Sequence, residues 1–393
     1  MNDTTKTSAS LPRTVWALGL VSLLMDASSE TIHGLLPLFL TTTLGASVAL
    51  VGIIDGVAEA TAAVAKVFSG YVSDRVGRRK PLILLGYGLG ALSKPLFPLA
   101  ASAGLVFGAR FIDRIGKGLR GAPRDALIAD VTPDCQRGRA YGLRQALDTV
   151  GAFIGPLAAI GLMQIYAGDM RVVFWFAALP ALLSVLLVLF GVQDAESTPR
   201  PASARAPIQW RDLRSLDAAY WRVVALGVVF TLARFSEAFL ILKARDSGLP
   251  LPLAPLVLVA MNVVYALGAY PAGVLADRMG PRRLLLAGLA ALIAADVLLA
   301  LGHGLIMIFT GIALWGLHMA LSQGLLAKLV ADHAPAALRG SAFGVFNLSS
   351  GVAMLLASAL AGVLWQLFGA ATTFWAGAVF ALLAALLVRA MGD

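Results

Sequence analysis

Two carboxyl side chains and one imidazole interrupt the apolar stretch "LLMDASSETIHGLLPLFL" at residues 23–40. Asp26 and Glu30 are one helical turn apart, and His33 follows three residues later. Carboxyl groups that are balanced between burial, a like-charged neighbour and a nearby arginine can bind and release protons. His33 can join such a relay because an imidazole ordinarily titrates near neutral pH, or it can be a hydrogen-bonded structural residue. The same three side chains are also a ligand set for a divalent metal ion.

Charged residues continue through the apolar segments of the first half. They are Asp55, Glu59 and Lys66, then Lys94, then Arg110, Asp113, Arg114, Lys117, Arg120, Arg124 and Asp125, and finally Arg144 and Asp148. A charge at the centre of a bilayer costs between about 2.5 and 10 kcal/mol, so each is a functional candidate. Because acids and bases are nearly balanced, we also expect many of them to form ion pairs, and a purely structural salt bridge is the alternative for each.

The second half carries far fewer polar groups in its apolar segments. They are Arg234, Glu237, Asn262, Tyr265, Asp296, His318, Gln323 and Asn347. We therefore expect the residues that carry out the coupling chemistry to lie in the first half, while the second half supplies an apolar wall.

The composition indicates that the segments holding these residues lie in a lipid membrane rather than in water. Of 393 residues, 59% are hydrophobic and 13% charged, and the mean hydropathy is +0.83, whereas soluble domains carry about 25% charged residues. Apolar runs near the ~20 residues that span a bilayer recur along the chain. There are twelve, at roughly 14–40, 47–72, 81–103, 105–128, 140–165, 171–192, 219–242, 251–275, 282–302, 304–330, 340–366 and 370–390. An all-α protein with twelve transmembrane helices is predicted, because lipid offers no hydrogen-bond partner to an unpaired backbone group.

The net charge of +9 follows the loops. Lys and Arg gather in alternate loops, at Lys6, Arg13, Arg75, Arg78, Arg79, Lys80, Arg137, Arg139, Arg200, Arg205, Arg211, Arg214, Arg278, Arg282, Arg283, Arg339 and Arg389. This positive-inside pattern predicts a multi-pass protein of a bacterial-type inner (plasma) membrane with both termini in the cytoplasm. Nucleic-acid binding is not expected.

The first apolar segment is too long for a signal peptide and should remain as the first helix. The single cysteine, Cys135, excludes an internal disulfide.

The chain repeats itself. "ADVTPDCQRGRAYG" at 129–142 returns as "ADHAPAALRGSAFG" at 331–344, and "GYVSDRVGRR" at 70–79 returns as "GVLADRMGPRR" at 273–283. This predicts an N-terminal six-helix bundle at 1–192, a cytoplasmic linker at 193–218 and a C-terminal six-helix bundle at 219–393. Parallel six-helix repeats place the substrate site at mid-membrane between the halves.

The loop at 70–79 resembles the signature loop of the major facilitator superfamily. The matching residues are Gly70, Asp74, Arg75, Gly77, Arg78 and Arg79, with a weaker copy at Gly273, Asp277, Arg278, Gly280 and Arg282. The resemblance implies two pseudo-symmetric six-helix bundles, alternating access, a gating role for these loops and a monomer. The alternative for each loop is a basic turn with a helix cap.

Two further matches concern energy coupling. Gly142, Gly151, Gly155 and Pro156 resemble the antiporter motif of proton-coupled exporters in this superfamily, although Ala159-Ile160 replaces its last glycine pair. Small residues at this spacing also serve tight helix packing. The run from Arg114 to Ala122 resembles an arginine motif of proton-coupled members, with Lys117 and Arg120 as departures from it.

The resemblance implies that the first and fourth helices face the central cavity. The proton-coupling and cavity candidates are Asp26, Glu30, His33, Arg110, Asp113, Arg114, Lys117 and Asp148 from the first half, and Arg234, Glu237, Asn262, His318 and Gln323 from the second.

These observations predict a secondary transporter that exports small organic or amphipathic compounds in exchange for protons. It would use the proton gradient as its energy source and need no cofactor. A divalent metal exporter and an organic anion transporter, with the basic residues of 105–128 as clamps, are the alternatives. The sequence contains no nucleophile–His–Asp set and no phosphate-binding glycine loop, so we do not expect an enzyme.

Overall fold

The computed structural model describes residues 11–76, 78–194, 216–322, 325–334 and 339–390, and all of its regular elements in these ranges are helices. The first half contains α1 (Arg13–His33), α2 (Leu36–Leu38), the π-helical turn η1 (Phe39–Thr43), α3 (Val48–Val76), α4 (Lys80–Ser93), α5 (Leu96–Leu99), α6 (Ala103–Val131), the 3-10 turn η2 (Asp134–Gln136), α7 (Arg137–Ile165) and α8 (Met170–Gly191). The second half contains α10 (Ala218–Leu232), α11 (Ala238–Asp246), the 3-10 turn η4 (Leu251–Leu253), α12 (Leu256–Met279), α13 (Pro281–Leu301), α14 (Leu305–Ser322), α15 (Leu325–His333), α16 (Arg339–Phe368) and α17 (Ala370–Ala390).

Ten spans of the described chain are long and apolar enough to cross a membrane. Two of the twelve predicted spans are not among these ten, for different reasons. α6 is long enough but carries many charged residues, and the run predicted at 219–242 is divided into α10 and α11. With these two included, the helices match the twelve predicted crossings.

Several crossings are interrupted near their middle or far end. Pro37 follows the end of α1, and Pro95 separates α4 from α5, because proline removes a backbone donor and clashes with the preceding turn. Between α10 and α11 there is no proline. There Ser236 accepts a hydrogen bond from the Ala238 amide, and its own amide donates to Ser358 Oγ, 122 residues away.

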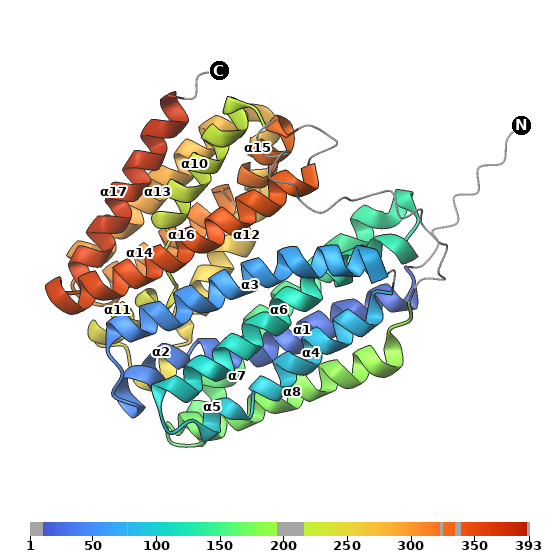
Figure 1. Cartoon of the computed structure of the whole chain (residues 1–393). Coiled ribbons are helices and arrows are strands. Elements are labelled where there is room, and N and C mark those ends of the chain that lie inside the picture. Colours follow the sequence, from blue (N-terminus) through green and yellow to red (C-terminus); the bar gives the residue numbers. More distant parts are fainter. Residues whose placement is uncertain (1–10, 77, 195–215, 323–324, 335–338, 391–393) are drawn as a thin grey trace, which may run out of the picture.

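The helices pack as two groups that meet along a limited seam (Figure 1). In the first group α1 packs on α7 and α8, while α6 packs on α3 and α4. In the second, α13 packs on α14 and α17, and α10 packs on α16. The groups touch where α3 meets α16, where α7 meets α12 and where α2 meets α11. The exact division at residues 192 and 219 stays a prediction, and most of the predicted linker, residues 195–215, lies outside the described residues.

The seam between α3 and α16 is built from glycines. A Cβ on Gly52 would lie 2.2 Å from Ser358 O, and one on Gly56 would lie 2.9 Å from Leu355 O. On the opposite helix, Gly351 meets Ala63 and Gly362 meets Ala49. These contacts occupy α3 from its start to residue 63. We call the membrane side where α3 begins the far side, and the side where α1 begins the near side. The two halves of the protein are therefore joined along the part of α3 that lies toward the far side of the membrane.

A second close contact joins α1 to α7. A Cβ on Gly151 would lie 2.3 Å from Leu23 O, and one on Gly155 would lie 2.6 Å from Ala27 O and 2.8 Å from the Glu30 Cβ. Nothing lies within 4 Å of the corresponding position on Gly142. Two glycines of the exporter-like motif therefore serve tight packing, and that packing positions the segment of α1 that carries the acids.

Gly151→Ala tests this contact. The added methyl group must displace the backbone of α1, and overpacking of this kind costs about 1–3 kcal/mol. We expect a lower midpoint of thermal unfolding for the purified protein. Gly161→Ala on the same helix is the control, since nothing lies within 4 Å of its Cβ position, and it should leave the midpoint unchanged or raise it. Equal midpoints for the two variants would contradict the described packing.

Candidate functional site

A cavity of about 320 Å³ lies between the two halves. The first half lines it with Glu30, His33, Leu36, Pro37, Leu40, Val51, Asp55, Glu59, Arg110, Arg114 and Lys117, and the second with Arg234, Phe235, Ser236, Glu237, Ala238, Ile241, Leu258, Trp315 and Met354. The first half thus supplies most of the charge. The second supplies the apolar and aromatic surface, together with the polar segment between α10 and α11.

The end of α1 places an acid and an imidazole in the cavity wall. Glu30 Oε1 lies 3.4 Å from His33 Nδ1, and Arg114 donates a hydrogen bond to His33 Nε2. His33 therefore connects Glu30 to an arginine of α6. No ion pair between Glu30 and a lysine or arginine is present among the described residues.

Two arginines of α6 are held by two acids of α3. Arg110 Nη2 lies 3.0 Å from Asp55 Oδ1, and Arg114 Nη1 lies 3.2 Å from Glu59 Oε1. Asp55 and Glu59 are four residues apart on α3, as Arg110 and Arg114 are on α6. Both ion pairs therefore form between the facing sides of these two helices. Asp55 also accepts a hydrogen bond of 2.7 Å from Ser236 Oγ, which makes it a direct link between the two halves.

A third ion pair lies behind the cavity wall. Lys94 Nζ lies 2.8 Å from Asp113 Oδ1 and donates to Ser29 Oγ at 3.0 Å. Lys94 and Asp113 are both buried, and Asp113 Oδ2 is also 3.8 Å from Arg114 Nε. Asp113 is thus placed within the α6 network, while the cavity lining does not include it.

Three charged groups in the cavity wall form no ion pair with a described residue. They are Lys117, Arg234 and Glu237. Arg234 Nε is a buried donor without a hydrogen-bond partner, and so is Trp315 Nε1. Charges left unpaired beside a cavity are available to a ligand, whereas the paired ones mainly hold the wall in place.

The remaining intramembrane candidates lie away from this lining. Asp26 is half-buried, and its carboxyl lies beside that of Asp148 on α7. Asp148 Oδ2 in turn is 3.3 Å from Arg144 Nη2. His318 is buried with its Nδ1 2.8 Å from Gly288 O, and Asn262 is half-buried on α12. Gln323 lies outside the described residues.

The loop candidates are described only in part. Arg75 donates to the Tyr71 hydroxyl at 3.1 Å, and Arg78 is exposed. A Cβ on Gly70 would make an ordinary 3.5 Å contact with Ala122. Gly77 and the side chains of Asp74, Asp277 and Arg278 lie outside the described residues.

Sequence reasoning did not single out several residues that complete these sites. In the loop they are Asp130, which lies 3.4 Å from Arg79, and Asp194, which accepts hydrogen bonds from the amides of Arg79 and Lys80. In the cavity, Phe235, Ser236 and Trp315 were missed. The signal for Asp130 was its place in the repeated segment at 129–142. For the cavity residues the only signal was their position beside Arg234 and Glu237 or near His318.

Comparison with known proteins assigns this arrangement to a family. The sequence profile of the Major Facilitator Superfamily matches residues 18–261 and 235–391. An uncharacterized MFS-type transporter of Methanocaldococcus jannaschii is 30% identical, over 96% of this chain and 94% of that protein. The tetracycline resistance protein, class C, of Escherichia coli is 28% identical over 81% of this chain and 79% of that protein. A crystal structure of the nucleoside transporter NupG superposes with a TM-score of 0.81 at 15% identity, over 97% of this chain and all of that one.

The chain therefore belongs to the major facilitator superfamily. It is a multi-pass membrane protein with the fold of that family, and it is a secondary transporter of small molecules and not an enzyme. The cavity between its halves is in the position where transporters built from two such repeats bind their substrates.

Asp113→Asn tests the buried network behind the cavity. The substitution leaves the Lys94 ammonium buried without a counter-charge, and breaking a buried ion pair in this way costs about 3–5 kcal/mol. We expect a lower thermal midpoint and less folded protein in detergent.

The double variant Lys94→Met/Asp113→Leu is the matched control, because it removes both charges together. It should recover a large part of the stability. An Asp113→Asn protein as stable as the unmodified chain would show that this ion pair does not support the fold.

Proposed function

We propose that the protein is a proton-coupled exporter of small organic or amphipathic compounds. The observation that carries this proposal is that two carboxyl groups, Glu30 from the first half and Glu237 from the second, line one cavity without a lysine or arginine partner among the described residues. A carboxyl group that is not committed to an arginine can gain and lose a proton as access changes between the two sides.

The paired acids have a different part in this proposal. Asp55 and Glu59 are held by arginines, and Asp113 is held by Lys94, so we assign these three a structural role. Asp26, beside Asp148 on α7, is the next candidate for proton transfer, one turn nearer the side where α1 begins. His33 lies between Glu30 and Arg114 and is placed to pass a proton or to hold Glu30 in position.

The rest of the wall fits an amphipathic solute. Phe235, Leu258 and Met354 offer apolar surface, whereas Lys117, Arg234 and Trp315 Nε1 offer unpaired hydrogen-bond donors. Export is supported by the resemblance to a tetracycline resistance protein. We further propose that the protein acts as a monomer in the plasma membrane, with both termini in the cytoplasm as the loop charges indicate.

An organic anion is the second candidate for the solute. It is favoured by the lack of ion-pair partners for Lys117 and Arg234, one from each half, at the same cavity. A carboxylate or phosphate would complete both. The metal-exporter alternative has no such observation, since in the described ranges no three His, Cys, Asp or Glu side chains are grouped so as to hold a metal ion.

Purified protein in liposomes under an imposed pH gradient tests the proposal. The panel comprises tetracycline and cationic drugs, organic anions and divalent metal ions, with proton flux recorded in parallel. We expect Glu30→Gln, Glu237→Gln and Asp26→Asn each to reduce gradient-driven transport to the level of empty liposomes while the folded protein is retained, because an amide cannot exchange protons.

Asp169→Asn is the control substitution. Its carboxylate accepts hydrogen bonds from the amides of Arg171 and Val172 at the start of α8, and asparagine caps a helix equally well. This variant should transport normally. Solute movement without proton flux, or normal transport by all three neutralised variants, would refute the proposed coupling.

A further inference from the structure

Asp296 on α13 is a buried carboxyl group for which the fold provides no partner. Its side chain is 0% exposed, and neither Oδ1 nor Oδ2 is hydrogen bonded within the described part of the chain. It is not among the cavity-lining residues. The sequence placed it in the ninth span without assigning it a role.

The groups around Asp296 do not neutralise it. The helices packed against α13 are α14, α17 and α12. Their described titratable side chains are His318 on α14, Tyr265 on α12 and Arg389 at the end of α17. Arg282 and Arg283 are at the start of α13 itself. His318 uses its Nδ1 on Gly288 O, and Arg282 donates to the carbonyl of Arg389. None of these five forms an ion pair or hydrogen bond with Asp296.

A carboxyl group in this setting works against stability. Burying a polar group without a hydrogen-bond partner costs free energy, and burying it charged costs far more. Leucine or alanine would pack at such a position without this cost. Acidic residues inside membrane spans are generally functional for this reason. Burial without a partner therefore favours the neutral acid over the carboxylate at Asp296.

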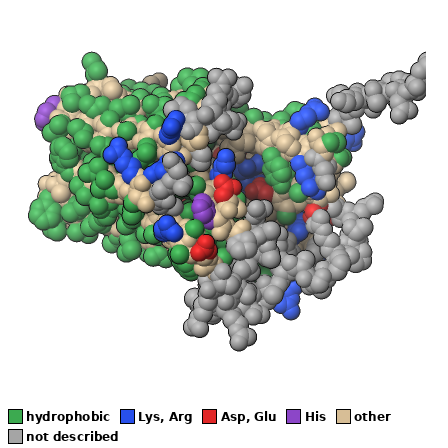
Figure 2. Space-filling view, turned by 90° about the horizontal axis from the view of Figure 1, so that it is seen from above, with side chains coloured by type: hydrophobic (Ala, Val, Ile, Leu, Met, Phe, Trp, Pro, Cys, Tyr) green, Lys and Arg blue, Asp and Glu red, His purple; other side chains and the backbone are tan. Residues whose placement is uncertain are grey.

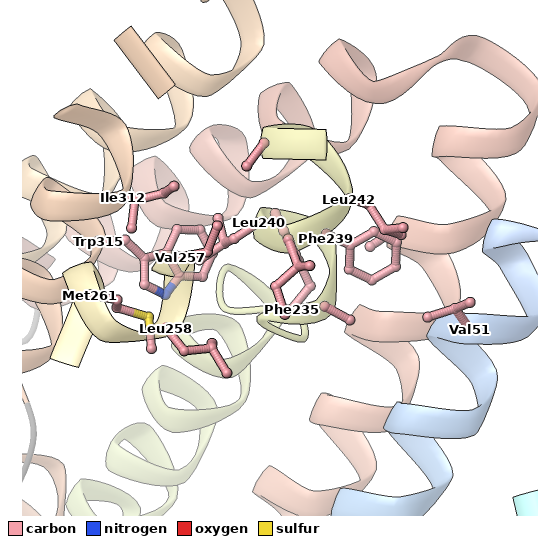
Figure 3. Packing of buried hydrophobic residues seen from close by; sticks show 14 of the residues in the cluster. Val51, Phe235, Phe239, Leu240, Leu242, Val257, Leu258, Met261, Ile312 and Trp315 are labelled. Atoms are coloured by element: carbon pink, nitrogen blue, oxygen red, sulfur yellow. The ribbon is translucent and has the colours of Figure 1, made fainter. Parts of the chain in front are cut away.

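Phe235 lies close to Asp296 and also lines the cavity. Asp296 Oδ2 and Phe235 Cε1 both lie against Gly377 of α17, at 2.7 Å and 3.0 Å from the point where a Cβ would be. The Phe235 ring is part of the cavity lining, and its centroid lies 5.3 Å from that of Trp315 and 5.6 Å from that of Phe374. Figure 3 shows residues of α11, α12 and α14 packed around Phe235, with Val51 of α3 nearby.

The segment that carries Phe235 is also the one that links the halves. It lies between α10 and α11, where the backbone is not helical, and the neighbouring Ser236 donates to Asp55 of the first half. A change in how the halves meet therefore acts directly on Phe235. Since the segment has few helical hydrogen bonds to break, it can move more readily than a continuous helix.

We propose that Asp296 is a second proton-binding site, in the C-terminal half, and that Phe235 closes it from the cavity. When the segment at 233–237 shifts, water reaches the carboxyl. The carboxylic acid then gives its proton to a water molecule, which becomes hydronium and leaves a carboxylate, and the reverse transfer restores the acid. The use of this site in transport rests on the proton coupling proposed above, whereas its protonation does not.

Infrared difference spectra recorded across a pH series test the site without any solute. The full-length protein in liposomes is compared with Asp296→Asn and Glu30→Gln. We expect the asparagine variant to lose one carbonyl band of a protonated carboxylic acid that Glu30→Gln retains. Phe235→Ala should speed the shift of this band after transfer to heavy water, because the carboxyl becomes accessible from the cavity.

Two further measurements separate proton binding from a structural role. Because no partner is lost, Asp296→Asn should unfold at a midpoint no lower than that of the unmodified chain, and Asp296→Glu should keep the band. In liposomes, Asp296→Asn should lower the number of protons moved per solute.

Opposite outcomes would overturn the site. A complete set of bands in Asp296→Asn, or a marked loss of stability in that variant, refutes it. If the band is lost as expected but the unmodified protein moves no protons with any solute, the site stands and the proposed function fails.

Discussion

Ion pairs between α6 and its two neighbours allow the most highly charged helix of the chain to lie within the membrane. Arg110 and Arg114 reach α3, and Asp113 reaches Lys94 next to the end of α4. Without these partners each group would impose the cost of an isolated charge in lipid. Because these contacts point in two directions around α6, toward α3 and toward the end of α4, they also fix its rotation and its depth. The cavity wall of the first half follows from that placement.

The two halves use polar groups in different ways. In the first half most of the arginines within the membrane spans have a carboxylate partner, as expected of groups that hold helices in register. In the second half Asp296 and His318 are isolated among apolar residues, and each has a polar atom without a partner. Figure 2 shows one face of the molecule, where hydrophobic side chains cover a wide area beside a gathering of acidic and basic ones. Paired groups confer rigidity, whereas isolated ones respond to the arrival of water or a ligand.

Much of the fold could be predicted from the sequence because membrane spans are signalled locally. The helical class, the repeat and the excess of charge in the first half all came from runs of residues and their spacing. The near balance of charges predicted ion pairing, and the four-residue spacing of Asp55 with Glu59 and of Arg110 with Arg114 is the pattern that two facing helices require. The identity of each pair depends on helix rotation, which a single sequence does not contain.

The site was harder to predict because its decisive contacts join distant segments. Asp26 and Glu30 are one turn apart, yet the cavity is lined by Glu30, His33 and Leu36 and begins beyond Asp26. The interruption between α10 and α11 contains neither glycine nor proline. It depends on hydrogen bonds from Ser236 to Ser358 and Asp55, which belong to other helices. Such contacts exist only once the halves have assembled.

The bonding of Asp55 has a kinetic consequence for the working cycle. Its pair with Arg110 lies within one half and can persist throughout, so the carboxylate never has to be stripped of its counter-charge when the halves separate. Among the described contacts of Asp55, the one that must break when the halves separate is the hydrogen bond from the Ser236 hydroxyl, and a hydrogen bond to a charged group contributes about 1.5–3 kcal/mol. Opening the far side must also part the close packing of α3 against α16, but it does not require the separation of Asp55 from its arginine.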